Sequence, residues 1–246
     1  MKIEKVILAS NDNLDYLEFW PVVSAAWKKI DIEPVLFYTG KDKNIIKKGA
    51  GQVVHCENIG IDSVFHAQCI RLLAPSLFPN DICIISDIDD LPLNYNFFHG
   101  NVGPYDEEKF IIFRPDVCGR DQTSMCWNVA KGKVWGEIFN VNNWKEINQT
   151  LLSWFPKDYK VFGSGWFTDQ IILRKYIDAW ESQDKIVRLH DTRTGFYRLD
   201  RHENSLNHTT TYKENMKNRY SDFHMPRPFK QYQEYIQHVF DNITTK

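Results

Sequence analysis

The chain has 246 residues, of which 43% are hydrophobic and 25% charged, and its formal net charge is −2. This composition is typical of a globular domain with a sizeable core and excludes a disordered or fibrous chain. Because the charge is near neutral, we expect no nucleic-acid partner. No apolar run approaches the ~20 residues of a membrane helix, so we expect no transmembrane segment. The five cysteines lack CxxC spacing, which favours reduced thiols and a cytoplasmic location.

Strand and helix patterns alternate over the first ninety residues. Continuous apolar runs predict strands, and apolar residues spaced three or four apart predict helices. Pro21 lies near the start of the first helix, where we expect a bend or a late start. The alternation predicts an α/β fold with a mostly parallel central sheet flanked by helices. In chain order the elements are strand 5–9, helix 16–30, strand 35–38, strand 52–56, helix 63–77 and strand 82–85.

The strand at 82–85 is followed directly by Asp87, Asp89 and Asp90. The strand is wholly apolar, as expected when both faces are buried, and ligands bind at the carboxyl edge of such sheets. Like charges this close need a cation between them, and oxygen ligands suit Mn²⁺ or Mg²⁺. In extended backbone, Asp87 and Asp89 point to one side and Asp90 to the other. The alternative is a solvated acidic turn, and for Asp90 we favour turn capping.

The pattern loosens after Pro92. Residues 94–108 are expected to form a polar linker, and 135–139 a strand or a short helix. Residues 185–230 show poor periodicity and hold ten Lys and Arg against five Asp and Glu. That segment suits closure over a polyanionic ligand, and the alternative is an irregular solvated surface. The clearer patterns predict strands at 110–113 and 124–130, helices at 144–154 and 168–180, and a C-terminal amphipathic helix at 229–243.

Several polar segments occur in a specific order. They are Ser10-Asn11-Asp12 after the first strand, Arg71 on a helix, Asp87-Ile88-Asp89, Asp169-Gln170 at a helix start, and His224 before Pro-Arg-Pro. This order resembles the GT-A-fold nucleotide-sugar glycosyltransferases, above all family 8 and the small glycosyltransferases of large DNA viruses. The likeness is strongest over residues 1–92; beyond them it depends on Asp169-Gln170 and the late His.

The resemblance implies a single GT-A (Rossmann-like) domain. Residues 1–92 would be its nucleotide-sugar-binding half, and 93–246 its acceptor and catalytic half. The implied activity is metal-dependent hexosyl or deoxyhexosyl transfer from a UDP-sugar to a hydroxyl of a glycan or glycoconjugate. A nucleotide sugar and a glycan acceptor would be its partners, in the host cytoplasm if the chain is viral.

The same resemblance assigns a metal site and a donor site. Asp87, Asp89 and His224 would hold Mn²⁺ or Mg²⁺, and His190 and His208 are the rivals of His224. For the donor, the residues expected to bind the nucleotide and its phosphates are Ser10, Asn11, Asp12, Arg71 and Asp87. Their structural alternatives are helix capping for the first three and capping of helix carbonyls for Arg71.

Asp169 and Gln170 are the candidate catalytic residues. Asp169 would deprotonate the acceptor hydroxyl in an inverting enzyme, whereas in retaining family 8 enzymes the matching Asp and Gln hold the donor sugar. The alternative is an Asp favoured by the helix dipole. The loop Gly163-Ser164-Gly165 would let the backbone approach a sugar. Two other functions stay open: a non-catalytic nucleotide- or carbohydrate-binding module, and an Asp-dependent phosphohydrolase.

Overall fold

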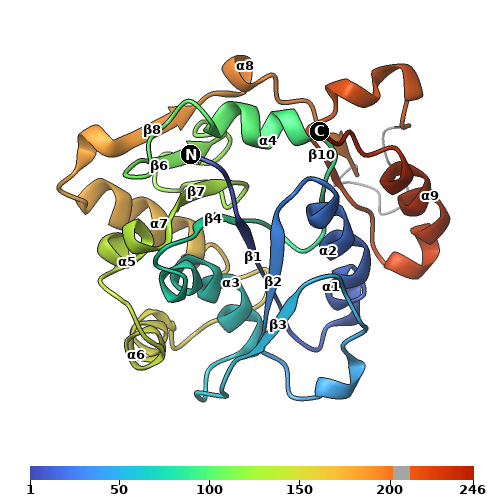
Figure 1. The fold of residues 1–246 in the computed structure, drawn as a ribbon. Coiled ribbons are helices and arrows are strands. Elements are labelled where there is room, and N and C mark those ends of the chain that lie inside the picture. Colours follow the sequence, from blue (N-terminus) through green and yellow to red (C-terminus); the bar gives the residue numbers. More distant parts are fainter. Residues whose placement is uncertain (202–210) are drawn as a thin grey trace.

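The computed structural model describes residues 1–201 and 211–246. Its centre is a seven-stranded sheet in the order β3-β2-β1-β4-β7-β6-β8 (Figure 1). Neighbouring strands are parallel except at β7, which runs antiparallel to β4 and β6. The predicted single domain with a mostly parallel sheet is confirmed. The strands are β1 (Lys5–Ser10), β2 (Glu33–Tyr38), β3 (Gln52–His55), β4 (Ile82–Ile85), β6 (Phe110–Phe113), β7 (Asn128–Lys131) and β8 (Ile186–Leu189).

Helices cover both faces of this sheet (Figure 1). In β4, Ile82 and Ile84 face one hydrophobic core while Cys83 and Ile85 face the other, because successive side chains of a strand alternate. The first core is closed by α1 (Leu14–Leu17), α2 (Trp20–Lys29), α4 (Tyr95–Val102) and α9 (Phe229–Asp241). The second is closed by α3 (Ser63–Leu73), α5 (Gly132–Phe139), α6 (Trp144–Trp154) and α7 (Thr168–Ala179). A short α8 (Asp191–Thr194) follows β8.

Local sequence signals explain several helix boundaries. The first predicted helix is divided into α1 and α2 just before Pro21, which occupies the first turn of α2. Asp62 caps α3 by accepting hydrogen bonds from the backbone N–H groups of Val64 and Phe65. Residues 135–139 belong to a helix, α5, and the predicted C-terminal amphipathic helix is α9.

The expectation of a polar linker at 94–108 is wrong, because α4 lies within it. The Asn94 side chain caps this helix by accepting a hydrogen bond from the backbone N–H of Phe97 at 3.2 Å. Phe97, Phe98 and Val102 are buried in the first core. These three apolar residues are interspersed with Asn, His and Gly, which is too sparse a pattern to predict a helix. Burial of the two aromatic rings stabilises the helix in the folded protein.

A second, three-stranded sheet brings the late part of the chain to the end of β4. It has the order β5-β10-β9, with β5 (Asp90–Pro92), β9 (Leu199–Asp200) and β10 (Asp222–His224). β5 and β10 are antiparallel, with His224 opposite Asp90. The Met225 N–H also donates to the Asp89 carbonyl at 2.9 Å. Strands of two or three residues carry no readable periodicity, which explains why 185–230 looked irregular.

Candidate active site

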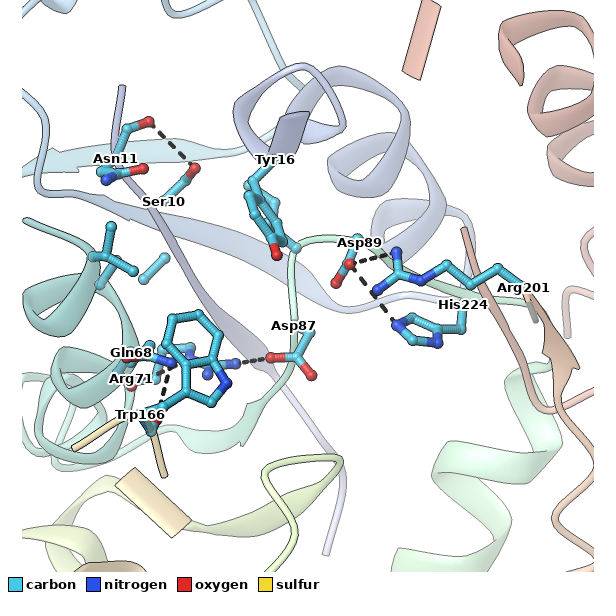
Figure 2. Close-up of a pocket in the computed structure, with 14 residues that line it drawn as sticks. Ser10, Asn11, Tyr16, Gln68, Arg71, Asp87, Asp89, Trp166, Arg201 and His224 are labelled. Atoms are coloured by element: carbon cyan, nitrogen blue, oxygen red, sulfur yellow. Dashed lines mark hydrogen bonds and ion pairs between the residues drawn. The ribbon is translucent and has the colours of Figure 1, made fainter. Parts of the chain in front are cut away.

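The carboxyl ends of β1 and β4 open into a cavity of about 220 Å³ (Figure 2). This is the sheet edge predicted to bind a ligand. Both halves of the chain contribute side chains, since α3 forms one wall while the loop before α7 and the small sheet form others. The polar and aromatic residues lining the cavity are Ser10, Asn11, Tyr16, Gln68, Arg71, Asp87, Asp89, Trp166, Arg201 and His224.

Asp89 and His224 face each other at one side of the cavity (Figure 2), with Asp89 Oδ2 3.8 Å from His224 Nε2. The other ring nitrogen, Nδ1, lies 2.8 Å from Asp200 Oδ1. A carboxylate that fixes one nitrogen of a histidine while the other faces a second carboxylate is typical of metal-ligating histidines. Arg201 Nη1 lies 2.8 Å from Asp89 Oδ2 and supplies positive charge there.

Asp87 points away from this pair, toward Arg71 (Figure 2), and its carboxylate also accepts a hydrogen bond from the Cys126 thiol at 2.9 Å. Burial would raise the pKa of Asp87, but the charge of Arg71 and the hydrogen bonds from Cys126 and Arg71 lower it well below its ordinary value. Asp87 is therefore an anion held by Arg71. Over residues 1–201 and 211–246, no group of three or more His, Cys, Asp or Glu side chains is arranged to hold a metal ion.

Arg71 also links the cavity to Asp169. Its guanidinium is nearly buried, with Nη2 3.4 Å from Asp169 Oδ2, and pairs with Asp87 through Nη1. Burial raises the pKa of Asp169 to about 6, although Arg71 opposes that shift. A carboxyl group with a pKa near neutrality is suited to exchange protons with a substrate. The neighbouring Gln170 side chain accepts a hydrogen bond from the Cys118 thiol at 3.3 Å.

The residues after β1 divide into two groups. Ser10 and Asn11 line the cavity, and the Asn11 amide donates to Ser63 Oγ at 3.0 Å, which ties the loop to the start of α3. Asp12 is not among the lining residues. Its carboxylate accepts hydrogen bonds from Tyr38 and from the backbone N–H groups of residues 41 and 42, so it organises the next loop.

Asp90 does not cap the turn. It is 1% exposed, and Arg198 Nη2 lies 2.9 Å from its Oδ2. Arg198 Nε is also 2.6 Å from Oδ2 of Asp222, which is fully buried. Burial raises the pKa of Asp90 well above its ordinary value, with Arg198 opposing and Asp222 adding to the shift. This buried triad joins β5, β9 and β10 directly behind Asp89 and His224.

Several lining residues were not anticipated. Arg201 lies in the segment without periodicity, so no pattern pointed to it. Tyr16 and Gln68 lie on helices, at positions for which the sequence predicts no ligand contact, while Trp166 follows the Gly163-Ser164-Gly165 loop that is expected to approach a sugar. Of the rival histidines, His190 pairs with Asp116 at 2.5 Å by a different cavity, and His208 lies outside the described residues.

No family model and no curated protein matches the chain. Among solved structures it is similar to the galactosyltransferase LgtC in complex with donor and acceptor sugar analogs, at 13% identity and a TM-score of 0.47, over 98% of this chain and 97% of that one. A glycosyltransferase involved in glycosylation of the major capsid of PBCV-1 is 10% identical, with a TM-score of 0.49 and coverage of 96% and 98%. GlyE of Streptococcus pneumoniae TIGR4 is 17% identical, with a TM-score of 0.47 over 78% of this chain. The chain spans 46% of GlyE.

Identities and scores this low lend no weight to a function. The function of the chain must therefore be inferred from the side chains of the cavity. In the described ranges, none of the helices combines the length and the apolarity needed to span a bilayer.

Proposed function

We propose that the chain is a metal-dependent GT-A glycosyltransferase that transfers a hexosyl or deoxyhexosyl group from a UDP-sugar to a hydroxyl of a glycan or glycoconjugate. The observation that carries the proposal is the arrangement of Asp89, His224 and Asp200 at the carboxyl edge of the sheet. It combines an oxygen ligand, an oriented imidazole nitrogen and a cavity at the edge where α/β sheets bind ligands.

Asp89 and His224 are the residues that would hold Mn²⁺ or Mg²⁺. Asp87 points toward Arg71 in the structure, and it is proposed as the third ligand after its side chain turns from Arg71 toward Asp89 and His224. When bound, such an ion stabilises the negative charge that grows on the pyrophosphate leaving group. Arg201 Nη1 lies 2.8 Å from Asp89 Oδ2, so this carboxylate already interacts with a positive charge in the structure.

The donor would bind along the remaining walls of the cavity. Ser10 and Asn11, which line the cavity, are proposed to bind the nucleoside, and Asp12 is proposed to contribute from the adjacent loop that its carboxylate organises. Arg71 lines the cavity and carries the charge and the planar donor geometry suited to a phosphate. In the same site Asp87 is proposed to contact the ribose as well as the ion.

Asp169 and Gln170 are proposed to act at the reacting centre. In the transfer, the bond between the anomeric carbon and the phosphate oxygen breaks, UDP leaves, and the acceptor oxygen bonds to that carbon. The acceptor hydroxyl proton goes to Asp169 in an inverting reaction, for which a pKa of about 6 is suitable. In a retaining reaction, the two residues hold the donor sugar instead.

Five free thiols support a reducing compartment, and we propose the cytoplasm. None of the five cysteines is paired in a disulfide. Secreted domains usually depend on such bonds, whereas glutathione and thioredoxin keep cytosolic thiols reduced.

Calorimetric titration of UDP in Mn²⁺ and then in EDTA tests the donor site. Binding should occur with Mn²⁺, disappear with EDTA, and be lost in Asp89→Ala. Asp178→Ala is the matched control. Asp178 is an exposed carboxylate on α7 that pairs only with Arg174 in the contacts described. Lack of binding by UDP, GDP and dTDP under both conditions would refute the proposal, as would donor turnover by Asp89→Ala in EDTA.

Release of UDP from a panel of UDP-sugars, with and without glycan acceptors, tests turnover. Asp169→Ala should abolish transfer while UDP still binds, because Asp169 is proposed to act on the acceptor hydroxyl or the donor sugar and not on the nucleotide. A wild-type chain that binds UDP but turns over none of the sugars would instead be a binding module on the same fold.

A further inference from the structure

The loop between α6 and α7 presents two aromatic rings beside the cavity. Trp166 lines the cavity (Figure 2), and the ring of Phe162 lies 4.4 Å from that of Trp166, centroid to centroid, at an angle of 40°. Phe162 is 72% exposed, the highest value among the large hydrophobic side chains described as exposed. Aromatic rings bury large areas when they find partners, so an exposed ring continuous with a pocket indicates a surface for a ligand.

The backbone holds Phe162 in a conformation that its side chain disfavours. Its φ is +58°, in the left-handed region where a bulky residue is an outlier. Such outliers persist only when the surroundings impose them, and they occur often at ligand-binding sites. Gly165, with φ +75°, takes the second left-handed position of the loop, and a Cβ there would lie 2.6 Å from Pro156 Cγ.

The loop is anchored to the same helix face that lines the donor cavity. The Trp166 carbonyl accepts a hydrogen bond from the Gln68 amide at 3.3 Å, and Tyr159 Oη donates to the Gln68 amide oxygen at 2.9 Å. Within the loop, the Lys160 N–H donates to the Ser164 carbonyl at 2.9 Å. These contacts hold the backbone of the loop that carries both rings against α3.

Gln68 also relates the two rings to the proposed reacting centre. It lies three residues before Arg71, so the two side chains share one face of α3. Gln68 contacts Trp166, and Arg71 contacts Asp169 at 3.4 Å. The Trp166 backbone and the Asp169 carboxylate therefore lie against adjacent positions of one helix face, which brings the loop that carries the rings close to the proposed reacting centre.

We propose that Phe162 and Trp166 form an aromatic platform that binds a pyranose ring of the acceptor. This inference depends on the proposed glycosyl transfer. The apolar face of a sugar ring suits an exposed aromatic surface, while the exposed ammonium group of Lys160 in the same loop can donate hydrogen bonds to its hydroxyls. A uracil base would also stack on aromatic rings, but the nucleoside is assigned to the Ser10 and Asn11 side of the cavity.

Saturation-transfer NMR with methyl glycosides of galactose, glucose, mannose, fucose and xylose tests the platform without any donor. At least one glycoside should bind the wild type. Phe162→Ala and Phe162→Leu should weaken it about two- to tenfold, the range expected from losing one ring contact. Phe162→Tyr keeps the ring and should retain binding. Val161→Ala, at a 45% exposed position of the same loop, is the control for lost apolar area.

UDP calorimetry on the same variants separates this inference from the proposed function. UDP binding should be unchanged in Phe162→Ala. If the wild type does not bind UDP, the proposed donor site is refuted, but the glycoside experiment still tests the platform. The platform is refuted if no glycoside binds the wild type, if Val161→Ala weakens binding as much as Phe162→Ala, or if Phe162→Ala abolishes UDP binding. Binding to phosphatidylcholine–phosphatidylglycerol vesicles that disappears in Phe162→Ala would assign the rings to a membrane surface and also refute it.

Discussion

Replacing Arg198 by Met should lower the free energy of unfolding by more than the loss of an exposed ion pair does. Arg198 is the cation between two buried carboxylates, at 2.9 Å from Asp90 and 2.6 Å from Asp222. Met fills much of the same space but leaves both carboxylates without that partner. Removing one member of a buried ion pair costs about 3–5 kcal/mol. For a protein of this length, ~2–4 °C of Tm per kcal/mol gives a decrease of roughly 6–20 °C.

The loss in Arg198→Met should depend on pH. Burial and Asp222 already raise the pKa of Asp90 above its ordinary value, and Arg198 opposes that shift. Without the guanidinium, the protonated form of Asp90 is favoured still further. The loss of stability is therefore largest at a pH at which the Asp90 carboxyl must ionise. The free energy of unfolding of the variant, relative to wild type, should therefore fall as pH rises from 5 to 8.

Urea unfolding followed by tryptophan fluorescence at pH 5 and 8 measures both effects. Arg174→Met is the matched control, since Arg174 pairs with Asp178 at 2.6 Å but both side chains are more than a third exposed. We expect it to cost about 0.3–0.5 kcal/mol. A loss below about 1 kcal/mol in Arg198→Met, or one equal to that of Arg174→Met at both pH values, would refute the reasoning from burial.

Three further predictions follow from other features. If the reaction is inverting, transfer should increase with pH through about 6 as Asp169 ionises, and a pH–rate profile of kcat that lacks this step would argue against Asp169 as the base. Arg201→Gln should weaken UDP binding in Mn²⁺ if the guanidinium contacts the diphosphate. The same variant should strengthen UDP binding if the guanidinium only competes with the metal ion for Asp89. An unchanged affinity in calorimetry would show that Arg201 does not act in the site. Gly132→Ala should destabilise the fold in thermal unfolding, because its Cβ would lie 2.1 Å from a backbone carbonyl oxygen, whereas Gly100→Ala, with open space on α4, should stabilise it by up to about 1 kcal/mol.

The sequence was most informative where burial leaves a regular signature. The apolar run before Asp87 predicted β4 and the sheet edge that now carries the cavity. Alternation of apolar runs and helix patterns likewise predicted the parallel part of the sheet, because strands buried on both faces leave no room for polar residues.

The signal was weakest where tertiary contacts decide the structure. Arg198 and Arg201 lie near strands of two or three residues, too short to show a period, and each is placed by partners distant in sequence. Asp90 looked like a turn residue because its carboxylate gives no sign of a buried arginine that lies beyond residue 190. His224 could be identified only because the residues around it resemble those of a known family, since a single histidine forms no spacing pattern with other ligands.

The small sheet also governs when the cavity can be completed during folding. Asp89 follows the fourth strand of the chain, whereas His224 and Arg201 arrive with its last quarter. Strands this short are not stable alone, and contacts between segments so distant in sequence must first overcome the entropy of closing a long loop. A chain that has assembled only β1 to β4 therefore has one wall of the cavity without the imidazole and guanidinium that face it. If the cavity binds a nucleotide sugar as proposed, competence to bind it would be coupled to completion of the native fold, and an incomplete chain would leave the nucleotide-sugar pool untouched.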